Sequence, residues 1–564
     1  MKIYTSLIFL VLLLSACMKG EKVDLIVHNA KIYTLDLSNT VHEAIAIRNG
    51  KIVEVGPERQ ILNKYRAEET IDAQGKEMYP GFTDAHGHML MYAKQRLGID
   101  LRGVRSEQEL LHRCEQYKAQ HPNLKFVIGQ GWDQTMWAGQ EMPTNLQLNV
   151  LFPDIPVCLY RVDGHAALVN DFLIKKSRLL DQLDQLSGGE VVFSKQIMEG
   201  NLSLPSQLNL PRDSNFGQKI ILQTYRPTGV IIDNAINIVQ PFLPNYTKKE
   251  YFKALLQVQE ELFQYGITGV HEAGIDHEHI AWFKQLINAG QLKLNLYAML
   301  MDSPQNRQFA QKNGPFRYKN LSIRSFKCFA DGALGSRGAL LKAPYHDHKE
   351  SRGLLLTEVA RMQNLAQFSL KNGYQMNTHS IGDSANALIL KLYSEVFAKK
   401  PDHRFRIEHA QVIDPLDFQK FAQYAVFPSV QPTHAVSDAD WAEARLGKER
   451  LKGAYAYRTL LGQFGMIAIG TDFPVEQTNP FLTIQAAVHH NAAEALTLEQ
   501  VIRGMTIFAA YASFEENRLG TLEKGKDATF AIFEYPVNAE VGQVQNYAWR
   551  TFIKGRCVYK LEAL

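Results

Sequence analysis

The sequence predicts an α/β protein: a TIM-type (β/α)8 barrel with a small β-sandwich domain built from the N- and C-terminal segments. Two observations lead to this prediction. Short apolar strand candidates alternate with helix candidates from about residue 81 to residue 510, which favours a mostly parallel sheet, and a repeat number near eight indicates a barrel. Segments rich in Val and Ile flank this region on both sides, as expected for one small β domain interrupted by a larger one.

The composition fits a folded protein and excludes several other classes. Of the 564 residues, 46% are apolar and 21% are charged, and the 38 Gly and 21 Pro are near average, which excludes disorder and collagen-like sequence. The 61 basic and 58 acidic residues leave a net charge of +3, which is too balanced for a nucleic-acid-binding protein. The five cysteines include no CxxC pair, and their odd number argues against a disulfide framework.

A lipoprotein signal is predicted at the N-terminus. The apolar run from Leu7 to Leu14 has the length of a signal-peptide core and is too short to span a bilayer. The run ends in Leu-Ser-Ala-Cys, which resembles the lipobox of bacterial lipoproteins; the alternative is a buried N-terminal helix. We expect residues 1–16 to be a signal peptide and residues 17–22 to form a lipidated tether. The protein is then exported and held at a bacterial membrane through lipid on Cys17, and the lack of an acidic residue after Cys17 favours the outer membrane.

The two terminal segments, residues 23–80 and 515–564, are expected to form the sandwich domain together. In the first segment the strand candidates are Val23–Val27, Lys31–Thr34, Ala44–Arg48 and Lys51–Val55. Asn49-Gly50 lies between the last two and is a strong signal for a hairpin turn. In the second segment the candidates are Ala528–Phe533, Trp549–Ile553 and Cys557–Tyr559.

The barrel is expected over residues 81–514. Its helix candidates are 249–265, 357–372, 384–397 and 497–513, and the last begins with a capping-box pattern at Thr497 and Gln500. Its strand candidates that end in polar residues are Gly373–His379, Phe405–His409, Val426–Gln431 and Met466–Asp472. Three further candidates, 125–130, 156–161 and 267–272, fall where a regular barrel needs two. One of them is therefore expected to belong to an insertion around residues 135–245.

Histidines occur at the predicted C-terminal ends of successive strands, where barrel enzymes place their active sites. His86 and His88 are two residues apart in an extended segment, so both side chains point the same way and can reach one metal ion. The pair alone is equally compatible with hydrogen-bonded core histidines. His379, His409 and Asp472 end three later strands. Four imidazoles and a carboxylate in this pattern predict a site for Zn²⁺ or a similar ion.

Lys327 lies inside the apolar strand candidate Ser325–Phe329, where a lysine is unfavourable unless it is paired or modified. Burial lowers the pKa of a lysine and favours the neutral amine, which can react with CO₂. The resulting carbamate would bridge two cations, and the alternative is a salt bridge to an acidic residue. Cys328 is expected to point to the opposite face of the strand and to be part of the core.

These motifs resemble the amidohydrolase superfamily of metal-dependent hydrolases through the order HxH, Lys, His, His, Asp. Within it they resemble amidohydrolase family 3, which includes N-substituted formamide deformylase. The resemblance spans about residues 23–560 and rests on Gly131–Asp133, Asp163–His165, Phe329–Arg337, Gln431–His434, Gly470–Glu476 and Gly520–Ala528. The sequence departs from the family pattern at Thr471, where serine is common, and at His489-His490, where an apolar residue and an arginine are typical.

The resemblance implies two divalent metal ions per chain, with zinc as the expected metal. His86 and His88 would bind one ion with Asp472, His379 and His409 would bind the other, and carboxylated Lys327 would bridge them. Asp472 would also be the catalytic residue, which takes a proton from the metal-activated hydroxide and passes it to the leaving amine.

Six further residues in the family-like motifs are predicted to bind substrate. They are Trp132, Asp133, His165, Asp331, Arg337 and His434. The alternative is that they orient loops and metal ligands, with Asp331 and Arg337 forming an ion pair.

The resulting prediction is an exported, membrane-anchored amidohydrolase that cleaves a C–N bond in an N-acyl or N-formyl small molecule. One alternative is a related hydrolase or isomerase acting on a cyclic amide or an ester. Another is a lipoprotein that binds a solute without catalysis, although the complete set of expected ligands argues against that alternative.

Overall fold

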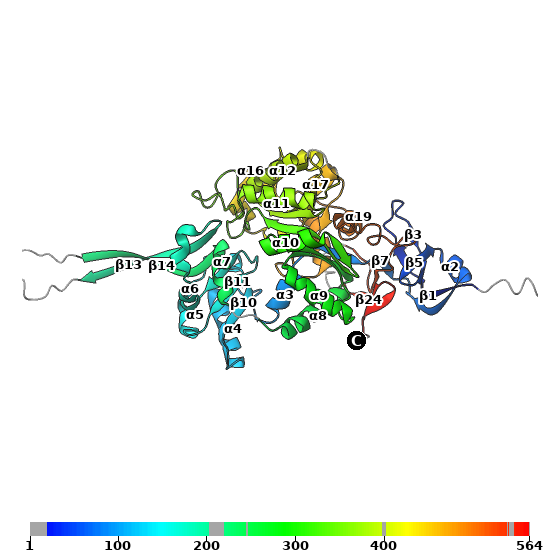
Figure 1. Ribbon diagram of the computed structural model, residues 1–564, viewed down its shortest axis with the longest axis horizontal. Helices are drawn as coiled ribbons and strands as arrows, with labels where there is room; N and C mark the ends of the chain where they lie inside the picture. Colours follow the sequence, from blue (N-terminus) through cyan, green and yellow to red (C-terminus); the bar gives the residue numbers. More distant parts are fainter. Residues whose placement is uncertain are drawn as a thin grey trace, which may run out of the picture. The chain divides into compact units, whose positions relative to one another are not determined.

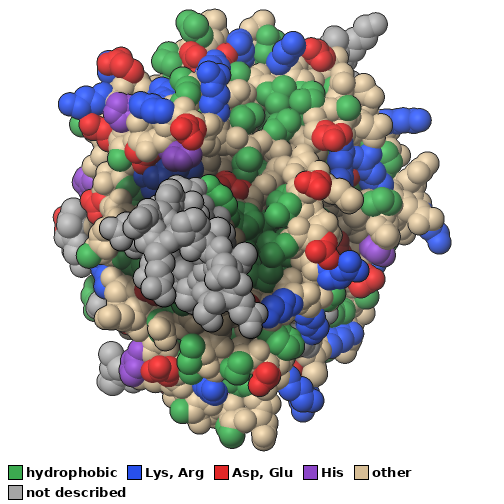
Figure 2. Space-filling model, turned by 90° about the vertical axis from the view of Figure 1, so that its left-hand side faces the viewer, with side chains coloured by type: hydrophobic (Ala, Val, Ile, Leu, Met, Phe, Trp, Pro, Cys, Tyr) green, Lys and Arg blue, Asp and Glu red, His purple; other side chains and the backbone are tan. Residues whose placement is uncertain are grey.

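The computed structural model describes residues 20–201, 219–243, 246–397, 402–538, 540 and 546–562 (Figure 1). The predicted signal peptide and Cys17 lie outside these residues. The chain divides into two compact units, Gln95–Tyr246 and a second one made of the residues before and after that segment. In the described part of the chain, no helix is long and apolar enough to cross a bilayer. Figure 2 shows acidic and basic side chains interspersed over one face of the molecule.

The larger unit contains the predicted barrel. Within the described residues, eight strands pair in parallel in the order β8, β15, β16, β18, β19, β20, β21 and β22. Their bounds are Phe82–Gly87, Ile267–Ile275, Asn295–Met301, Leu321–Phe329, Gln375–Ser380, Arg406–His409, Phe427–Val430 and Ala468–Ile469. The amide of Asp472 donates to the carbonyl of His86 over 2.7 Å, so the chain returns from β22 to β8. The expected parallel eight-stranded barrel is confirmed in this nearly closed form.

Three of the four predicted barrel helices are confirmed as α8 (Lys248–Gln264), α11 (Val359–Lys371) and α12 (Asp383–Phe397). Helix α8 begins with a capping box between Thr247 and Glu250, which satisfies backbone N–H groups at the open end of the helix. Other helices of the larger unit are α9 (His277–Asn288), α10 (Pro304–Asn313), α17 (Tyr457–Phe464) and α18 (Pro480–His489).

The fourth helix prediction, 497–513, is wrong because this segment forms two helices, α19 (Leu498–Gly504) and α20 (Ile507–Ala512). The predicted capping box at Thr497 and Gln500 is present. The helix breaks after Gly504 because the carbonyl of Met505 accepts from the amide of Thr83 in β8, over 2.7 Å. A pairing with the barrel therefore replaces the next intrahelical bond.

The terminal segments form two sheets that share one apolar core. The first sheet has the order β5-β4-β1-β6 and the second has the order β25-β24-β23-β7-β2-β3. Their bounds are β1 Glu21–His28, β2 Lys31–Tyr33, β3 Val41–His42, β4 Ala44–Arg48, β5 Lys51–Gly56, β6 Tyr65–Asp72, β7 Glu77–Pro80, β23 Phe530–Phe533, β24 Ala548–Ile553 and β25 Arg556–Lys560. The C-terminal β23 pairs with the N-terminal β7, and Ile47, Met78 and Phe530 lie in the shared core. Asn49 and Gly50 both have positive φ, as a tight hairpin turn requires.

The unit Gln95–Tyr246 has its own sheet, ordered β13-β14-β12-β11-β10-β9. The strands are Gly189–Asn201, Lys219–Asp233, Ala166–Val169, Val157–Arg161, Val127–Trp132 and Ile99–Asp100. The expectation that only one of the three strand candidates belongs to an insertion is wrong: 125–130 and 156–161 both contribute here, and only 267–272 belongs to the barrel. The unit also begins at Gln95, earlier than the expected 135. Strands β10 and β11 pair in parallel, so their sequences have the same pattern as barrel strands.

Candidate metal centre

The end of β8 presents His86, whose side chain is fully buried. Its Nδ1 lies 2.6 Å from Glu408 Oε2, and since a carboxylate only accepts, Nδ1 donates this hydrogen bond. The lone pair on Nε2 is therefore directed into the centre. Lys327 Nζ lies 3.1 Å from that nitrogen.

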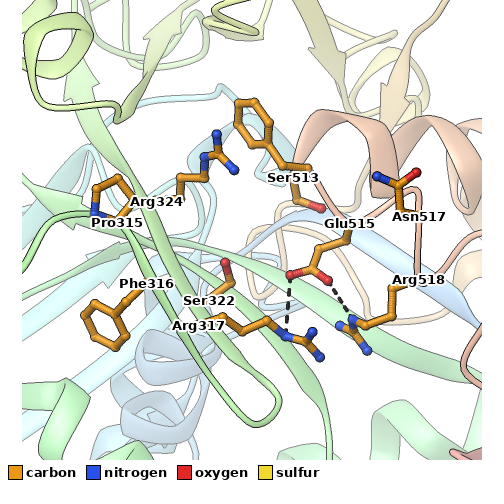
Figure 3. Close-up of a pocket in the computed structure, with 10 residues that line it drawn as sticks. Pro315, Phe316, Arg317, Ser322, Arg324, Ser513, Glu515, Asn517 and Arg518 are labelled. Carbon is orange, nitrogen blue, oxygen red and sulfur yellow. Dashed lines mark hydrogen bonds and ion pairs between the residues drawn. The ribbon is translucent and has the colours of Figure 1, made fainter.

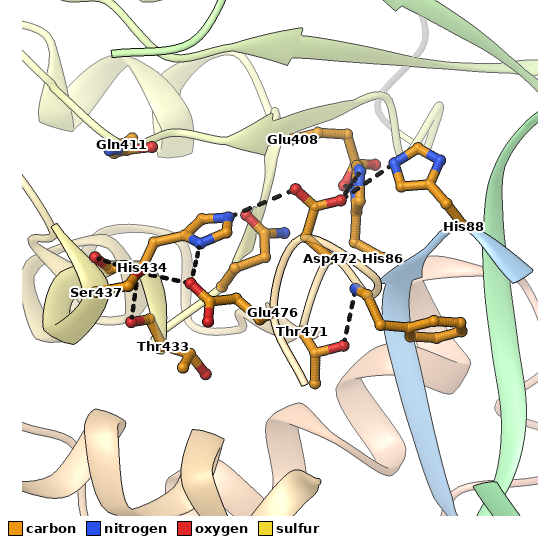
Figure 4. A network of polar contacts seen from close by, with 12 residues as sticks. His86, His88, Glu408, Gln411, Thr433, His434, Ser437, Thr471, Asp472 and Glu476 are labelled. Carbon is orange, nitrogen blue, oxygen red and sulfur yellow. Dashed lines mark hydrogen bonds and ion pairs between the residues drawn. The ribbon is translucent and has the colours of Figure 1, made fainter. Parts of the chain in front are cut away.

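Asp472 follows β22 and faces three histidines (Figure 4). Its Oδ1 lies 3.1 Å from His88 Nε2 and 3.7 Å from His86 Nε2, and its Oδ2 lies 3.5 Å from His434 Nε2. Burial acts to raise the pKa of this carboxyl, but the neighbouring imidazoles of His434 and His88 outweigh it and hold the pKa well below its usual value. Asp472 is therefore ionised at neutral pH.

His379 and His409 come from the ends of β19 and β20. Their ring centroids are 4.4 Å apart, and the ring of His409 is 4.9 Å from that of His86. Burial lowers the pKa of His409 well below its usual value, so the imidazole is neutral. Its Nδ1 is buried and has no hydrogen-bond partner among the described residues, which is unusual for a buried polar atom.

These observations test whether the residues fit a metal ion. His86, His409 and Asp472 each offer a ligand atom, and the three atoms lie within 4.8 Å of one another. Two neutral imidazoles and a carboxylate form a donor set that suits Zn²⁺ and similar ions. The unpartnered nitrogen of His409 is available as a ligand, so the residues fit a divalent cation.

All six predicted ligands lie around this one centre, although the three residues whose ligand atoms lie within 4.8 Å of one another combine two predicted subsets. His86 and Asp472 were expected to share one ion, and His409 was expected to bind the other. Lys327 is 1% exposed near the end of β18, and burial lowers its pKa to about 8.

The residues that hold His86 in place were not predicted from the sequence. Arg406 Nε donates to Glu408 Oε1 over 2.6 Å, and Arg406 also lies 2.9 Å from His271 Nδ1. Burial acts to raise the pKa of Glu408, but Arg406 and His86 outweigh it and keep the pKa well below its usual value. Arg406 and Glu408 are two residues apart in one barrel strand, so this alternation of charges was a usable signal.

Asp84 also holds the metal centre together and was not predicted from the sequence. Its Oδ1 accepts from the amides of His86 and Thr471 over 3.1 and 3.0 Å, and its Oδ2 accepts from Thr471 Oγ1 over 2.6 Å. These bonds tie the segment after β22 to β8. A Cβ on Gly470 would lie 2.4 Å from the amide nitrogen of His86, so this close approach requires glycine. Thr471 keeps the hydroxyl of the more common serine.

Three of the predicted substrate-binding residues lie in the larger unit. His434 is beside the centre, and its Nδ1 is 3.0 Å from Glu476 Oε1. Asp331 is fully buried and accepts from the amides of Leu340, Ile381 and Gly382 over 2.8 to 3.0 Å. Arg337 pairs with Asp347 at 3.0 Å.

The other three residues lie in the unit Gln95–Tyr246 and have partners there. Trp132 has no exposed surface, and its Nε1 donates to the carbonyl of Leu159 over 2.6 Å. Asp133 Oδ1 lies 2.5 Å from an Arg161 nitrogen, and His165 Nδ1 lies 2.5 Å from Asp233 Oδ1.

Comparison with known proteins agrees with this geometry. Residues 69–194 and 216–559 match the amidohydrolase family. The chain is 27% identical over 555 residues to the putative amidohydrolase YtcJ of Bacillus subtilis, covering 94% of this chain and 99% of that one. It is 23% identical over 569 residues to N-substituted formamide deformylase of Arthrobacter pascens, covering 95% and 98%. The crystal structure of an uncharacterized metal-dependent hydrolase from Pyrococcus furiosus is similar with a TM-score of 0.68 and 27% identity, covering 92% and 100%.

Proposed function

Because this chain belongs to the amidohydrolase family, we propose that it hydrolyses the C–N bond of an N-acyl or N-formyl small molecule. The convergence of His86, His409 and Asp472 within 4.8 Å carries the proposal, since a solute-binding protein has no need of such a ligand set. The similarity to a formamide deformylase supports the choice of bond.

Two divalent ions, zinc in both positions, form the proposed cofactor. His86, His88 and Asp472 would hold one ion, and His379 and His409 would hold the other. Bound ions would polarise the scissile carbonyl and lower the pKa of water.

Asp472 is the proposed proton carrier. Its carboxylate stays ionised beside His88 and His434, so Oδ2 can take a proton from the attacking water. The water oxygen bonds to the carbonyl carbon, Asp472 returns the proton to the leaving nitrogen, and the C–N bond breaks to release a neutral amine. His434 orients Oδ2 from 3.5 Å and is itself held by Glu476.

Lys327 is the proposed site of carboxylation. A protonated ammonium 3.1 Å from His86 Nε2 would repel a cation bound at that imidazole. Burial lowers the pKa of Lys327 to about 8, which raises the share of neutral amine. That amine can form an N–C bond with CO₂ and lose a proton, which converts a cation at the centre into an anionic oxygen ligand.

Metal content per chain tests the proposal. The protein without residues 1–17, purified without chelators and with bicarbonate, is expected to hold about two ions per chain, as paired metal centres do. Lys327→Ala should lower this value, and Lys371→Ala, at the end of α11, should not. One ion per chain in both variants would leave hydrolysis possible but exclude the carbamate bridge. No bound metal, even after zinc is added, would contradict the metal-dependent mechanism.

Export and lipid anchoring through Cys17 form a separate proposal, which rests on the lipobox-like sequence. Cells fed a labelled fatty acid should label the full chain and place it in the membrane fraction. Cys17→Ser should remove the label, whereas Cys557→Ser, at an exposed cysteine, should keep it. Equal labelling of both variants would contradict the assignment of Cys17.

A further inference from the structure

A cavity of about 330 Å³ lies near the starts of the barrel strands, away from the metal centre at their ends (Figure 3). It is lined by the hairpin of β17 (Phe316–Tyr318) and the first half of β18, and by residues that follow α20. All of these residues belong to the larger compact unit. The residues of β18 that line the cavity are Ser322 and Arg324, which precede Lys327 in the strand by five and three residues.

The hairpin places two arginines on one face. Arg317 in β17 lies directly opposite Ser322 in β18, so their side chains share a face of the ladder. Arg324 is two residues beyond Ser322, and both residues line the cavity. The diagonal pair Arg317 and Arg324 is therefore separated by roughly 7–8 Å at the backbone. Lys327 lies further along β18, at the metal centre, where its Nζ is 3.1 Å from His86 Nε2.

Both guanidinium groups have unused hydrogen-bond donors. In the described part of the chain, Arg324 has no hydrogen bond or ion pair, and its Nε is buried without a partner. Its guanidinium carbon lies 3.7 Å from the ring centroid of Phe514. The nearest carboxylate oxygen to Arg317 is Glu515 Oε1 at 3.8 Å, which is too far for a hydrogen bond.

Arg518, the third arginine of the cavity, differs from Arg317 and Arg324 because its guanidinium is hydrogen-bonded to protein groups. It donates to Glu515 over 2.7 Å, to Asp527 over 2.5 Å and to Asn295 over 3.2 Å. Glu515 thus forms a hydrogen bond with Arg518 and only a longer ion pair with Arg317. In the described part of the chain, Arg324 has no carboxylate partner. Burial, followed by the charge of Arg518, lowers the pKa of Arg317, as expected where cations are crowded.

Phe514 follows the end of helix α20: its amide donates to the carbonyl of Tyr511, and the amide of Glu515 donates to the carbonyl of Ala510, a common motif at helix C-termini. Its φ is 61°, in the left-handed region that bulky residues rarely adopt. This conformation places the aromatic ring against Arg324 and fixes the guanidinium at the cavity wall.

We propose that this cavity binds a small organic anion, with its carboxylate or phosphate group between Arg317 and Arg324 and its apolar part beside Phe514. The planar fork of donors on arginine matches both kinds of oxyanion. The cavity volume is at the lower end of the range for small-molecule sites. This site is separate from the metal centre and does not depend on the proposed reaction.

Calorimetric titration of the metal-replete protein tests the site, with benzoate, phenyl phosphate and inorganic phosphate as probes. Arg324→Gln and Arg317→Gln should each weaken binding by about tenfold or more, because each removes charge-assisted hydrogen bonds. Arg59→Gln, at an exposed arginine of α2 (Glu58–Lys64), makes the same charge change elsewhere and should leave the affinity unchanged. Comparison of benzoate with phenyl phosphate identifies the preferred oxyanion.

Two results would overturn the proposal. Unchanged affinity in both Arg317→Gln and Arg324→Gln would place the bound anion elsewhere, such as at the metal centre. Equal weakening in Arg59→Gln would show only the general effect of charge. Arg324→Gln could disturb folding, which a change in its thermal midpoint would reveal. In that case Arg317→Gln still tests the site, because Arg317 is exposed and its replacement should leave the fold intact.

Discussion

The metal centre can be compared with a cluster of charged and polar residues in the unit Gln95–Tyr246, which contains Asp133, Arg161 and His165. Both contain histidine, carboxylate and arginine side chains, but they differ in how their polar atoms are used. In the inserted unit, Arg161 donates to Asp133, Gln134 and Asp163, so its guanidinium is engaged within the cluster. In the barrel, His86 uses one nitrogen for Glu408 and directs the other into the centre, and His409 Nδ1 has no hydrogen-bond partner among the described residues.

Polarity alone therefore does not distinguish a reactive site from a structural cluster. Both clusters stood out in the sequence as polar motifs, and both contain a histidine held by a buried carboxylate: His86 by Glu408 and His165 by Asp233. Of these two clusters, the metal centre is the one in which several neutral imidazole nitrogens and an ionised carboxylate converge. There, a nitrogen such as His409 Nδ1 remains available to bind a metal ion. The following predictions test this contrast.

The largest effect is expected from Asp472→Asn. An amide cannot carry the proton that the leaving nitrogen requires, so turnover of an N-formyl amine should fall by about a thousandfold or more. The matched variant Asp133→Asn should change kcat by less than tenfold, and a rise in its KM would support the prediction that Asp133 contacts substrate. Steady-state kinetics on both variants, with circular dichroism to confirm folding, provides the measurement. Similar losses of kcat in the two variants would contradict the assignment of Asp472, rather than Asp133, to proton transfer.

A smaller effect is expected from Glu408→Gln. This change weakens the bond that fixes the tautomer of His86, and loss of such a supporting partner typically lowers metal affinity by about 10- to 100-fold. Asp233→Asn alters the equivalent histidine–carboxylate pair of the inserted unit and should leave metal affinity unchanged. Competition with a fluorescent chelator measures both values. If Asp233→Asn also lowers the metal affinity, the cluster in the unit Gln95–Tyr246 affects metal binding, and the proposed difference between the two clusters is wrong.

The third prediction concerns the pH at which the metal-free protein recovers activity. Carboxylation needs the neutral amine of Lys327, whose pKa is lowered to about 8. The neutral share increases as pH rises toward that value, so reactivation with zinc should be roughly twentyfold faster near pH 8.5 than near pH 6.5. Dissolved CO₂ is held constant in both reactions. A rate that is independent of both pH and CO₂ would contradict carboxylation and favour a Lys327 that acts without modification.

Several features were predictable from the sequence because they depend on neighbours along the chain. Short apolar runs that end in polar residues identified barrel strands such as β19, and helical patterns identified helices such as α8. Asn49-Gly50 identified a tight turn from the residues themselves. The positions of His86, His88, His379, His409 and Asp472 at strand ends followed from the same local pattern, and the parallel barrel then brought them together.

Other features depended on partners far apart in the chain, and only the tertiary structure decided them. Local periodicity could not assign β10 and β11 to the inserted unit, because a parallel strand looks the same in either sheet. It could not pair Arg337 with Asp347, direct Asp331 to three backbone amides, or break the helix at Met505. The support of His86 by Glu408 and the unsatisfied guanidinium of Arg324 likewise depend on packing between distant segments. The residue types and their positions along the chain thus indicate which side chains can react, and the fold sets which of them keep a donor or ligand atom without a protein partner.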